Sequence, residues 1–471
     1  MSSDDLAYLS ANELLERYRK KSLSPVEVTQ AALDRIDTHD GAVNAFVLTD
    51  PEGALATARE SEARWAKGEP SGSIDGVPVT IKDLVLTKGW PTRSGSLTTG
   101  TDPEPADAPI AARLREHGGV FLGKTTTPEF GWKGVTDSPL TGITRNPWDT
   151  SVTPGGSSGG AAVAAALGMG ALHCGGDGGG SIRIPASFTG VFGHKPSYGR
   201  VPRYPTGGHG TLSHAGPITR TVADAALMMN VTSEPDPRDW FALPYDGRDW
   251  RDGLEDGVAG LRVAFSPTLG YASVDPEVAA LVEAAAKQFE AMGAQVEAAD
   301  PGIDDPIDIF IPHWYGGTAH HLRNYSEEQL AQLDPGQREI VELGRKIDLT
   351  QFLSAIEART ALGIRMKEFH QEYDLLLTPA MPIPAFEAGR ELPVDWPGDR
   401  WMSWSPFTYP FNLTQQPASS VPCGFTAGGL PVGLQIVGRM HDDATVLRAS
   451  RAFERERPFE MPTAPNATHE A

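Results

Sequence analysis

The 471-residue sequence predicts an α/β protein in which parallel strands alternate with helices. Two segments carry this prediction. The first has a strand-like run at 76–81, a helical segment at about 106–117 and a short strand at 120–122. The second repeats the order of strand, helix and strand at 261–265, 276–293 and 295–297. Strands and helices that alternate at this spacing are typical of parallel sheets.

The N-terminal segment 1–67 is predicted to be helical and to pack on the rest of the domain. Ser10 with Glu13, and Ser24 with Glu27, have the spacing of capping boxes. In a capping box the serine and the glutamate satisfy free backbone amides at the start of a helix. These residues therefore indicate scaffold rather than chemistry, and a further helix is expected at 51–67.

The later elements are separated by two long irregular segments. Residues 199–216, beyond the second of the two glycine clusters described below, are rich in glycine and proline and are expected to form a long loop beside the site. Residues 236–257 are polar and are expected to be a surface excursion, and 459–471 a flexible tail. The remaining expected elements are helices at 221–229, 326–372 and 443–456 and strands at 374–378 and 432–437.

Composition excludes several classes of function. The 40 basic and 61 acidic residues give a formal net charge of −21, whereas nucleic acids and anionic membranes bind basic surfaces. No apolar run reaches the roughly 18 residues of a membrane span, and the N-terminus lacks the apolar core of a signal peptide. Two cysteines are too few for a disulfide framework or a zinc cluster. We therefore expect a cytoplasmic monomer or homodimer that acts on a small molecule without a metal or cofactor.

Two glycine and serine clusters organise the chain. Residues 155–160 read GGSSGG, and residues 175–181 read GGDGGGS. Glycine costs backbone entropy, so its concentration indicates unusual backbone angles or close approach of a ligand. Flexible linkers are the alternative, but the compact apolar segment 161–167 between the clusters disfavours them.

Several familiar chemistries do not fit these clusters. Residues 155–159 match G-x-S-x-G, yet Pro154 precedes them where a nucleophile elbow would have a strand. Neither cluster matches a phosphate-binding loop. Histidines 313, 320 and 321 lack partners at metal-ligand spacing and are expected in the core or at the surface. Cys174 is interpreted as a buried apolar residue, because no neighbour in sequence would stabilise a thiolate.

Serine chemistry without histidine remains. Ser181 follows three glycines, 178–180, whose amides could converge on an oxyanion. Lys82 falls at the end of a predicted strand and could serve as the base. Its pKa would have to fall by roughly 3 units from about 10.4, which burial can supply. Either Ser157 or Ser158 could relay the proton.

These motifs together resemble the amidase signature family. The segments GGSSGG at 155–160, GGDGGGSIRIPA at 175–186 and GHKP at 193–196 match its serine region. GVPVTIKD at 76–83 matches its lysine motif, and Ser157 and Ser181 have its spacing of 24 positions. Further similar segments are DLLLTP at 374–379, FNLTQQPASSVPCG at 411–424 and GLPVGLQIVG at 429–438. The resemblance covers nearly the whole chain.

The resemblance implies a fold and a set of roles. The fold would be one catalytic domain over 1–471, with a signature core at 76–196 and a mixed, largely parallel twisted sheet covered by helices on both faces. Ser181 would be the nucleophile, Ser157 the relay on a cis peptide bond, and Lys82 the base. The oxyanion donors would be the amides of Gly178, Gly179, Gly180 and Ser181. The supporting residues would be Asp177, Arg183 and Ser158.

Two glycines depart from the family pattern. Gly176 stands where threonine is common, which removes a hydroxyl contact. Gly178 replaces a bulkier residue, so a roomier pocket is expected.

Aromatic residues favour an apolar or aryl substrate, although core packing explains them equally well. The candidate substrate-binding residues are Trp132, Trp314, Trp401, Trp404 and Phe407. The preferred activity is hydrolysis of an aryl amide or carbamate, as in a urethanase, with esterase side activity. The alternative within the family is the glutamine-hydrolysing component of a tRNA-dependent amidotransferase, which delivers ammonia to a partner enzyme. A non-enzymatic scaffold is a third possibility.

Overall fold

A computed structural model describes residues 3–462, and the predicted flexible tail lies outside the described residues from 463 onward. The described chain contains one eleven-stranded sheet and a two-stranded ribbon. In spatial order the large sheet comprises β1 (Phe46–Thr49), β3 (Val120–Thr125), β2 (Pro78–Lys82), β6 (Leu172–Asp177), β8 (His214–Thr219), β7 (Phe192–Lys195), β12 (Ala418–Phe425), β13 (Pro431–Gly438), β11 (Leu375–Pro379), β9 (Arg262–Phe265) and β10 (Gln295–Ala298). The ribbon comprises β4 (Asp137–Ser138) and β5 (Gly142–Ile143).

The sheet is mixed, as predicted. Parallel pairing occurs in two blocks, β3-β2-β6 and β11-β9-β10. The strands between the blocks, and the edge strand β1, pair antiparallel. The two strand-helix-strand units read from the sequence supply the β2–β3 and β9–β10 pairs.

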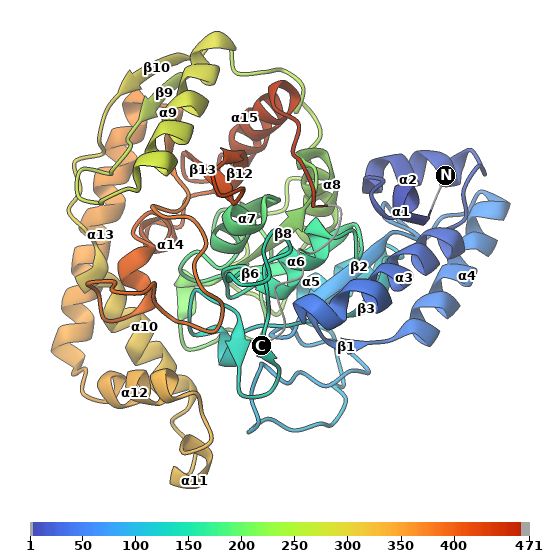
Figure 1. Ribbon diagram of the computed structural model, residues 1–471, viewed down its shortest axis with the longest axis horizontal. Helices are drawn as coiled ribbons and strands as arrows, with labels where there is room; N and C mark the ends of the chain where they lie inside the picture. Colours follow the sequence, from blue (N-terminus) through green and yellow to red (C-terminus); the bar gives the residue numbers. More distant parts are fainter. Residues whose placement is uncertain (1–2, 463–471) are drawn as a thin grey trace.

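Helices cover both faces of the sheet, which confirms the predicted α/β architecture. The helices are α1 (Ser3–Ala7), α2 (Ala11–Arg19), α3 (Pro25–Val43), α4 (Pro51–Lys67), α5 (Pro109–Glu116), α6 (Gly159–Ala166), α7 (Arg183–Thr189), α8 (Val222–Thr232), α9 (Pro276–Ala291), α10 (Ile307–His321), α11 (Glu327–Leu330), α12 (Pro335–Gly344), α13 (Leu349–Glu372), α14 (Pro410–Leu413) and α15 (Asp443–Glu456). Helices α7 and α15 both pack on β12 and β13, and Figure 1 shows them on opposite sides of these strands.

The N-terminal helices begin where the capping residues predict. Ser10 and Glu13 form a capping box at the start of α2, and Ser24 and Glu27 form one at the start of α3. Helices α3 and α4 then pack against each other and against β3. Figure 1 shows this blue segment projecting from one side of the molecule.

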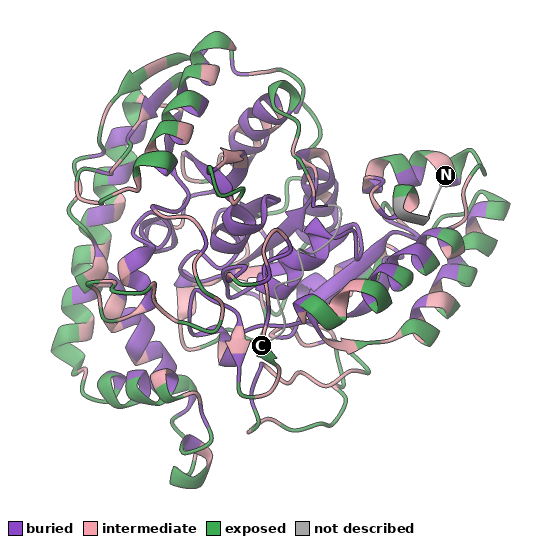
Figure 2. Cartoon of the chain, viewed as in Figure 1, coloured by how far each residue is buried: buried purple, intermediate pink, exposed green. Residues whose placement is uncertain are grey.

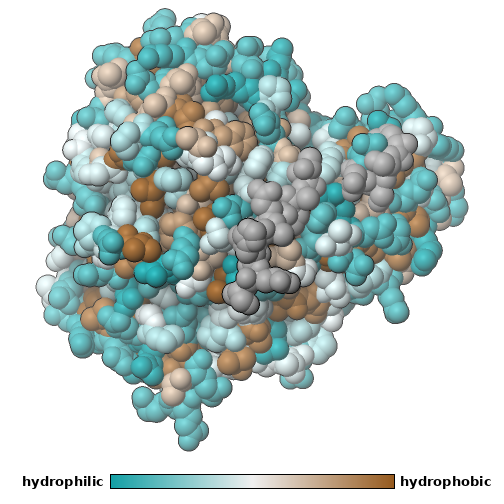
Figure 3. Space-filling model, viewed as in Figure 1, coloured by the Kyte–Doolittle hydropathy of each residue, from teal (hydrophilic) through white to brown (hydrophobic). Residues whose placement is uncertain are grey.

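The core lies around the central strands, where Figure 2 shows mostly buried chain, while α11 to α13 expose their outer faces. The surface in Figure 3 is largely hydrophilic with scattered apolar residues. The excursion predicted at 236–257 is only partly on the surface. Trp240 is 81% exposed, whereas Trp250 is 2% exposed and donates a hydrogen bond to the Ser233 hydroxyl. None of the described helices is long and apolar enough to cross a membrane.

Candidate active site

The two glycine clusters and Lys82 meet at the carboxyl ends of two neighbouring strands inside the sheet. Strands β2 and β6 are parallel neighbours, so their carboxyl ends lie side by side. Lys82 is the last residue of β2, and Asp177 is the last residue of β6. Carboxyl ends of parallel strands are where α/β proteins commonly place ligands and chemistry. This topology brings the lysine to the serines, 75 and 99 positions later in the chain.

The Lys82 ammonium group is buried against two hydroxyls. The side chain is 1% exposed, and Nζ donates to Ser157 Oγ at 2.7 Å and to Ser158 Oγ at 2.8 Å. Burial lowers the pKa of Lys82 to about 7, although the nearby charge of Asp177 acts in the opposite direction. A large part of the Lys82 population is therefore neutral at physiological pH and can accept a proton.

The two serines beside Lys82 are not equivalent. The Ser158 hydroxyl donates to the Gly176 carbonyl at 3.1 Å and accepts from the Gly176 amide at 3.3 Å. It is fully used in holding the two clusters together. The Ser157 hydroxyl contacts Lys82 and lines the open cavity, and the Gly156–Ser157 peptide bond is cis. Of the two candidate relays, the geometry favours Ser157.

Ser181 lines the same cavity as Lys82 and Ser157. Its hydroxyl makes no hydrogen bond with any residue from 3 to 462, so it is free to meet a substrate. The backbone amides of Gly178, Gly179 and Ser181 likewise have no partner in the described chain. The Gly180 amide, however, donates to Asp177 Oδ1 at 2.8 Å. The structure therefore contradicts the predicted role of Gly180 as an oxyanion donor, because a carboxylate already takes that amide.

A buried ion pair holds the loop that carries Ser181. Arg183 donates to both carboxylate oxygens of Asp177, at 3.0 and 2.9 Å, and neither side chain is exposed. Burial alone would raise the pKa of Asp177, but the Arg183 guanidinium lowers it well below its usual value. Arg183 also donates to Gln435 and Asn412. These two amides were missed as site residues, although each lies in a segment that resembles the family.

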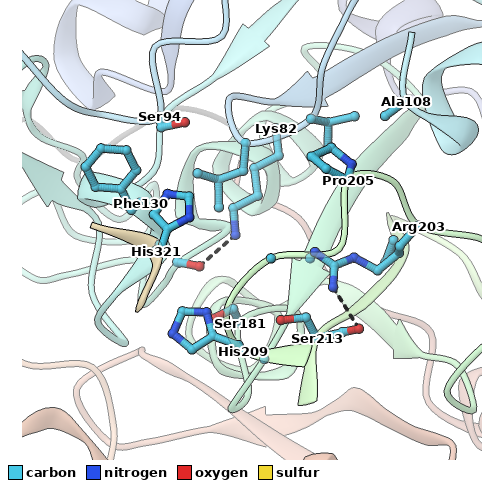
Figure 4. Close-up of a pocket in the computed structure, with 18 of the residues that line it drawn as sticks. Lys82, Ser94, Ala108, Phe130, Ser181, Arg203, Pro205, His209, Ser213 and His321 are labelled. Carbon is cyan, nitrogen blue, oxygen red and sulfur yellow. Dashed lines mark hydrogen bonds between the residues drawn. The ribbon is translucent and has the colours of Figure 1, made fainter. Parts of the chain in front are cut away.

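A cavity of about 440 Å³ is lined by the three candidate catalytic side chains. Figure 4 shows Lys82 and Ser181 among its lining residues. Trp132 and Trp314 line it, whereas Trp401, Trp404 and Phe407 do not. The last three are buried in the core instead. A Cβ on Gly179 would lie 2.8 Å from the Trp401 ring, which packs behind the oxyanion loop. Their selection as substrate-binding residues was wrong because sequence clustering does not distinguish a cavity wall from packing beneath it.

The roomier pocket expected at Gly178 is not present, because a neighbouring side chain fills the space. A Cβ placed on Gly178 would lie 2.9 Å from the Trp314 ring, so the indole occupies the space of the missing side chain. Glycine at this position therefore allows the Trp314 ring to pack closely against the backbone, and it does not enlarge the cavity.

Other wall residues were not singled out from the sequence, although some lie in a loop that was expected beside the site. Loop 199–216 forms one wall, as expected, and Phe130 packs against His321 and Tyr325 on another. Figure 4 shows Phe130 beside His321. His321 belongs to α10, a helix that the sequence analysis did not predict and that contains Pro312. His313 is buried and His320 and His321 are exposed, as expected, but His321 also lines the cavity. The missed wall residues are Phe130, Arg203, Tyr204, His209, His321 and Tyr325.

Two alternative chemistries find no support at this site. Cys174 is buried on β6, and burial raises the pKa of its thiol to about 12, so it stays protonated. Across residues 3–462 there is no group of three or more histidine, cysteine, aspartate or glutamate residues placed to hold a metal ion.

Comparison with known proteins agrees with this arrangement. The family model for Amidase matches residues 27–447, which is most of the chain. The chain belongs to the Amidase family. It is an enzyme that hydrolyses the C–N bond of amides, and the resemblance read from its motifs is confirmed.

The amidase is similar to relatives over its full length. An acylamidase of Rhodococcus erythropolis is 38% identical over 467 residues, 98% of each chain. A glutamyl-tRNA(Gln) amidotransferase subunit of Myxococcus xanthus is 37% identical over 498 residues, covering 98% of this chain and 99% of its own. The crystal structure of a bacterial aryl acylamidase of the amidase signature family matches with a TM-score of 0.90 at 32% identity, covering 96% of both chains.

Proposed function

We propose that this amidase hydrolyses aryl amides through an acyl-enzyme formed on Ser181. The observation that carries the proposal is the 2.7 Å contact between the buried Lys82 amine and the Ser157 hydroxyl. Neutral Lys82 takes the Ser157 proton while Ser157 takes the proton of Ser181, whose oxygen attacks the substrate carbonyl. Ser181 then carries the acyl group as an ester.

The same groups complete the reaction. The amides of Gly178, Gly179 and Ser181 stabilise the oxyanion, as donors placed for a developing charge do in acyl transfer. Lys82 returns its proton through Ser157 to the leaving amine. Water, activated by the same relay, then hydrolyses the ester and frees Ser181. Ser158, Asp177 and Arg183 act by holding the two clusters in place.

An aryl substrate is favoured by the cavity wall and by the relatives. Phe130, Trp132 and Trp314 give the cavity an aromatic lining, and about 440 Å³ suits a small ligand. The similar proteins include an acylamidase and an aryl acylamidase. Carbamates and esters also present a carbonyl group to the nucleophile, so the proposal extends to them as further substrates. We place the reaction on a small molecule, in a cytoplasmic monomer or homodimer.

A second candidate is glutamine hydrolysis with delivery of ammonia to a partner enzyme. The 37% identity to a glutamyl-tRNA(Gln) amidotransferase component favours it. This function requires glutaminase activity and a co-purifying partner, and the aryl function requires neither.

A substrate panel tests these alternatives. Purified protein is assayed on anilides, aliphatic amides, carbamates, esters and glutamine, and is labelled with a serine-reactive phosphonate. We expect anilides to be the best substrates and the label on Ser181. Preferred turnover of glutamine would support the second candidate. No turnover of the panel and no label on Ser181 would refute the proposed acyl-enzyme mechanism and favour the scaffold role.

A further inference from the structure

The cavity contains a guanidinium that the proposed reaction does not use. Arg203 lies in loop 199–216, where its backbone amide donates to the Asp239 carboxylate at 2.8 Å. Its side chain extends into the cavity beside Ser213 and Pro205 (Figure 4), and Nη1 donates to the Ser213 carbonyl at 2.9 Å. The backbone of Arg203 is thus fixed, and its side chain lies in the cavity wall.

Arg203 has no ion-pair partner in the described chain. No carboxylate among residues 3–462 lies within 4.0 Å of its guanidinium. Nε and Nη2 make no hydrogen bond with the described residues, and they are not among the buried atoms that lack a partner. These two donors are therefore accessible, on a side chain that lines the cavity. Arg183, by contrast, is saturated by Asp177 and neighbouring amides and carbonyls.

The other titratable groups of the cavity do not neutralise Arg203. Asp177 is committed to Arg183, and Glu104 on the wall lies outside ion-pair distance. Burial lowers the pKa of His209 to about 3 and lowers the pKa of His321, so both rings are neutral near pH 7. Lys82 also lines the cavity, but its pKa of about 7 leaves it only partly charged. Arg203, whose guanidinium keeps its proton, is therefore the permanent cation of this cavity.

Such a cation favours an anionic ligand. Removing a charge from water is costly unless a partner compensates it, and the flat guanidinium fork matches the two oxygens of a carboxylate. The Ser213 hydroxyl also lines the cavity and makes no hydrogen bond with residues 3–462, so it offers a second donor nearby.

We propose that Arg203 binds a carboxylate carried by the substrate, so that the preferred substrates are amides bearing a free carboxylate. The proposal rests on the proposed amide hydrolysis and narrows its substrate class. The aromatic wall holds the apolar part of the molecule, and Arg203 fixes its orientation relative to Ser181. Arg203 is a specificity residue and takes no part in the proton transfers.

Matched substrate pairs test the proposal. Glutaranilic acid and valeranilide differ by a carboxylate on the acyl side, and 4-acetamidobenzoate and 4-acetamidotoluene differ by one on the amine side. We expect the wild-type enzyme to prefer the acid of one pair by at least about tenfold in kcat/KM, which corresponds to about 1.4 kcal/mol. Arg203→Met should abolish this preference, mainly through KM, and Arg203→Lys should retain part of it.

A control variant separates this effect from general electrostatics. Arg338→Met removes an exposed arginine from α12 and should leave the acid preference intact. The proposal is overturned if the wild-type enzyme prefers neither acid, or if Arg203→Met keeps the preference.

A binding measurement decides the proposal even if the protein hydrolyses none of these anilides. Ser181→Ala protein is titrated with each pair by calorimetry. Tighter binding of one acid, lost in Ser181→Ala/Arg203→Met, supports the carboxylate site. Equal binding of acid and neutral compound overturns it. Failure of turnover alone would count against the proposed reaction and not against this site.

Discussion

At the scale of single residues, the proposed chemistry depends on a lysine that can lose its charge. Lys82 is almost completely buried and contacts two hydroxyls, neither of which carries a negative charge to hold its proton. A carboxylate in either position would keep the lysine cationic and unable to act as a base. The nearest compensating charge, Asp177, is instead neutralised by Arg183.

Replacement of this base should abolish turnover without unfolding the protein. Lys82→Ala is expected to lower kcat by about 10²- to 10⁴-fold, the usual contribution of general acid-base catalysis. Steady-state kinetics on the best anilide measure the loss, and circular dichroism checks the fold. Lys346→Ala, which removes an exposed lysine, is the control. Activity of Lys82→Ala within a few-fold of wild type would refute the proposed mechanism.

The pH dependence follows from the same group. Because its pKa is lowered to about 7, Lys82 is neutral above that pH and protonated below it. Activity should therefore be present at alkaline pH and should fall about tenfold per unit as pH drops below about 7. The measurement is kcat/KM for an uncharged anilide between about pH 5 and 9. A flat profile through neutrality would exclude Lys82 as the titrating base.

At the scale of elements, the Asp177–Arg183 pair joins the end of β6 to distant parts of the chain. Arg183 reaches Gln435 on β13, and Asn412 on α14 donates to the Asp177 carboxylate at 2.8 Å. Because this network is buried, each member depends on the others for compensation. The loop that presents the oxyanion donors is thereby fixed to two C-terminal elements.

Breaking this pair should destabilise the protein strongly. Arg183→Met leaves the Asp177 carboxylate buried without its cation, and we expect a loss of about 3–5 kcal/mol in the free energy of unfolding. Urea denaturation at pH 7 measures the change. A loss below about 1 kcal/mol would mean that the buried pair contributes little.

The sequence predicted those elements whose signals are local. The capping serines marked α2 and α3, and alternation of helix and strand marked β2, β3, β9 and β10. Lys82, Ser157 and Ser181 could be predicted as one site because each lies in a specific motif, and the structure places all three at one cavity. Helix α10 was missed because glycines and Pro312 weaken its helical pattern. Asn412 and Gln435 were left without a role because only long-range folding brings them to Arg183.

At the scale of the whole molecule, the substrate cavity is assembled from distant segments. Phe130 and Trp132 come from the first third of the chain, and Trp314 and Tyr325 from a helical region nearly two hundred residues later. No periodicity links such segments, so their meeting could not be predicted from the sequence. For the same reason the sequence could not show that Trp401 and Trp404, which were grouped with Trp132 and Trp314 as candidate substrate-binding residues, do not line the cavity.

A small ionic network joins these two segments. Lys133, 5% exposed, contacts the carboxylates of Asp137 at 2.6 Å and Asp334 at 2.9 Å, and the Asp334 amide donates to Glu129. It lies next to Trp132 and ties the start of α12 to the cavity wall.

Loss of this lysine should therefore loosen the wall more than the chemistry. Lys133→Met leaves two carboxylates without their shared cation, and we expect KM for anilides to rise about tenfold with a smaller change in kcat. Steady-state kinetics with wild-type and variant enzyme give both constants. An unchanged KM would show that the wall keeps its shape without the network.

The close contact between Gly178 and Trp314 limits how this enzyme can be redesigned. One aromatic side chain, Trp314, both limits the room for the substrate and packs behind Gly178, whose amide is a proposed oxyanion donor. Trimming that indole to admit bulkier compounds would also remove the support of the amide, so selectivity and rate would decline together. Engineering for larger substrates should begin instead at Phe130, whose ring packs on those of Tyr325 and His321 rather than behind the amides of the second glycine cluster.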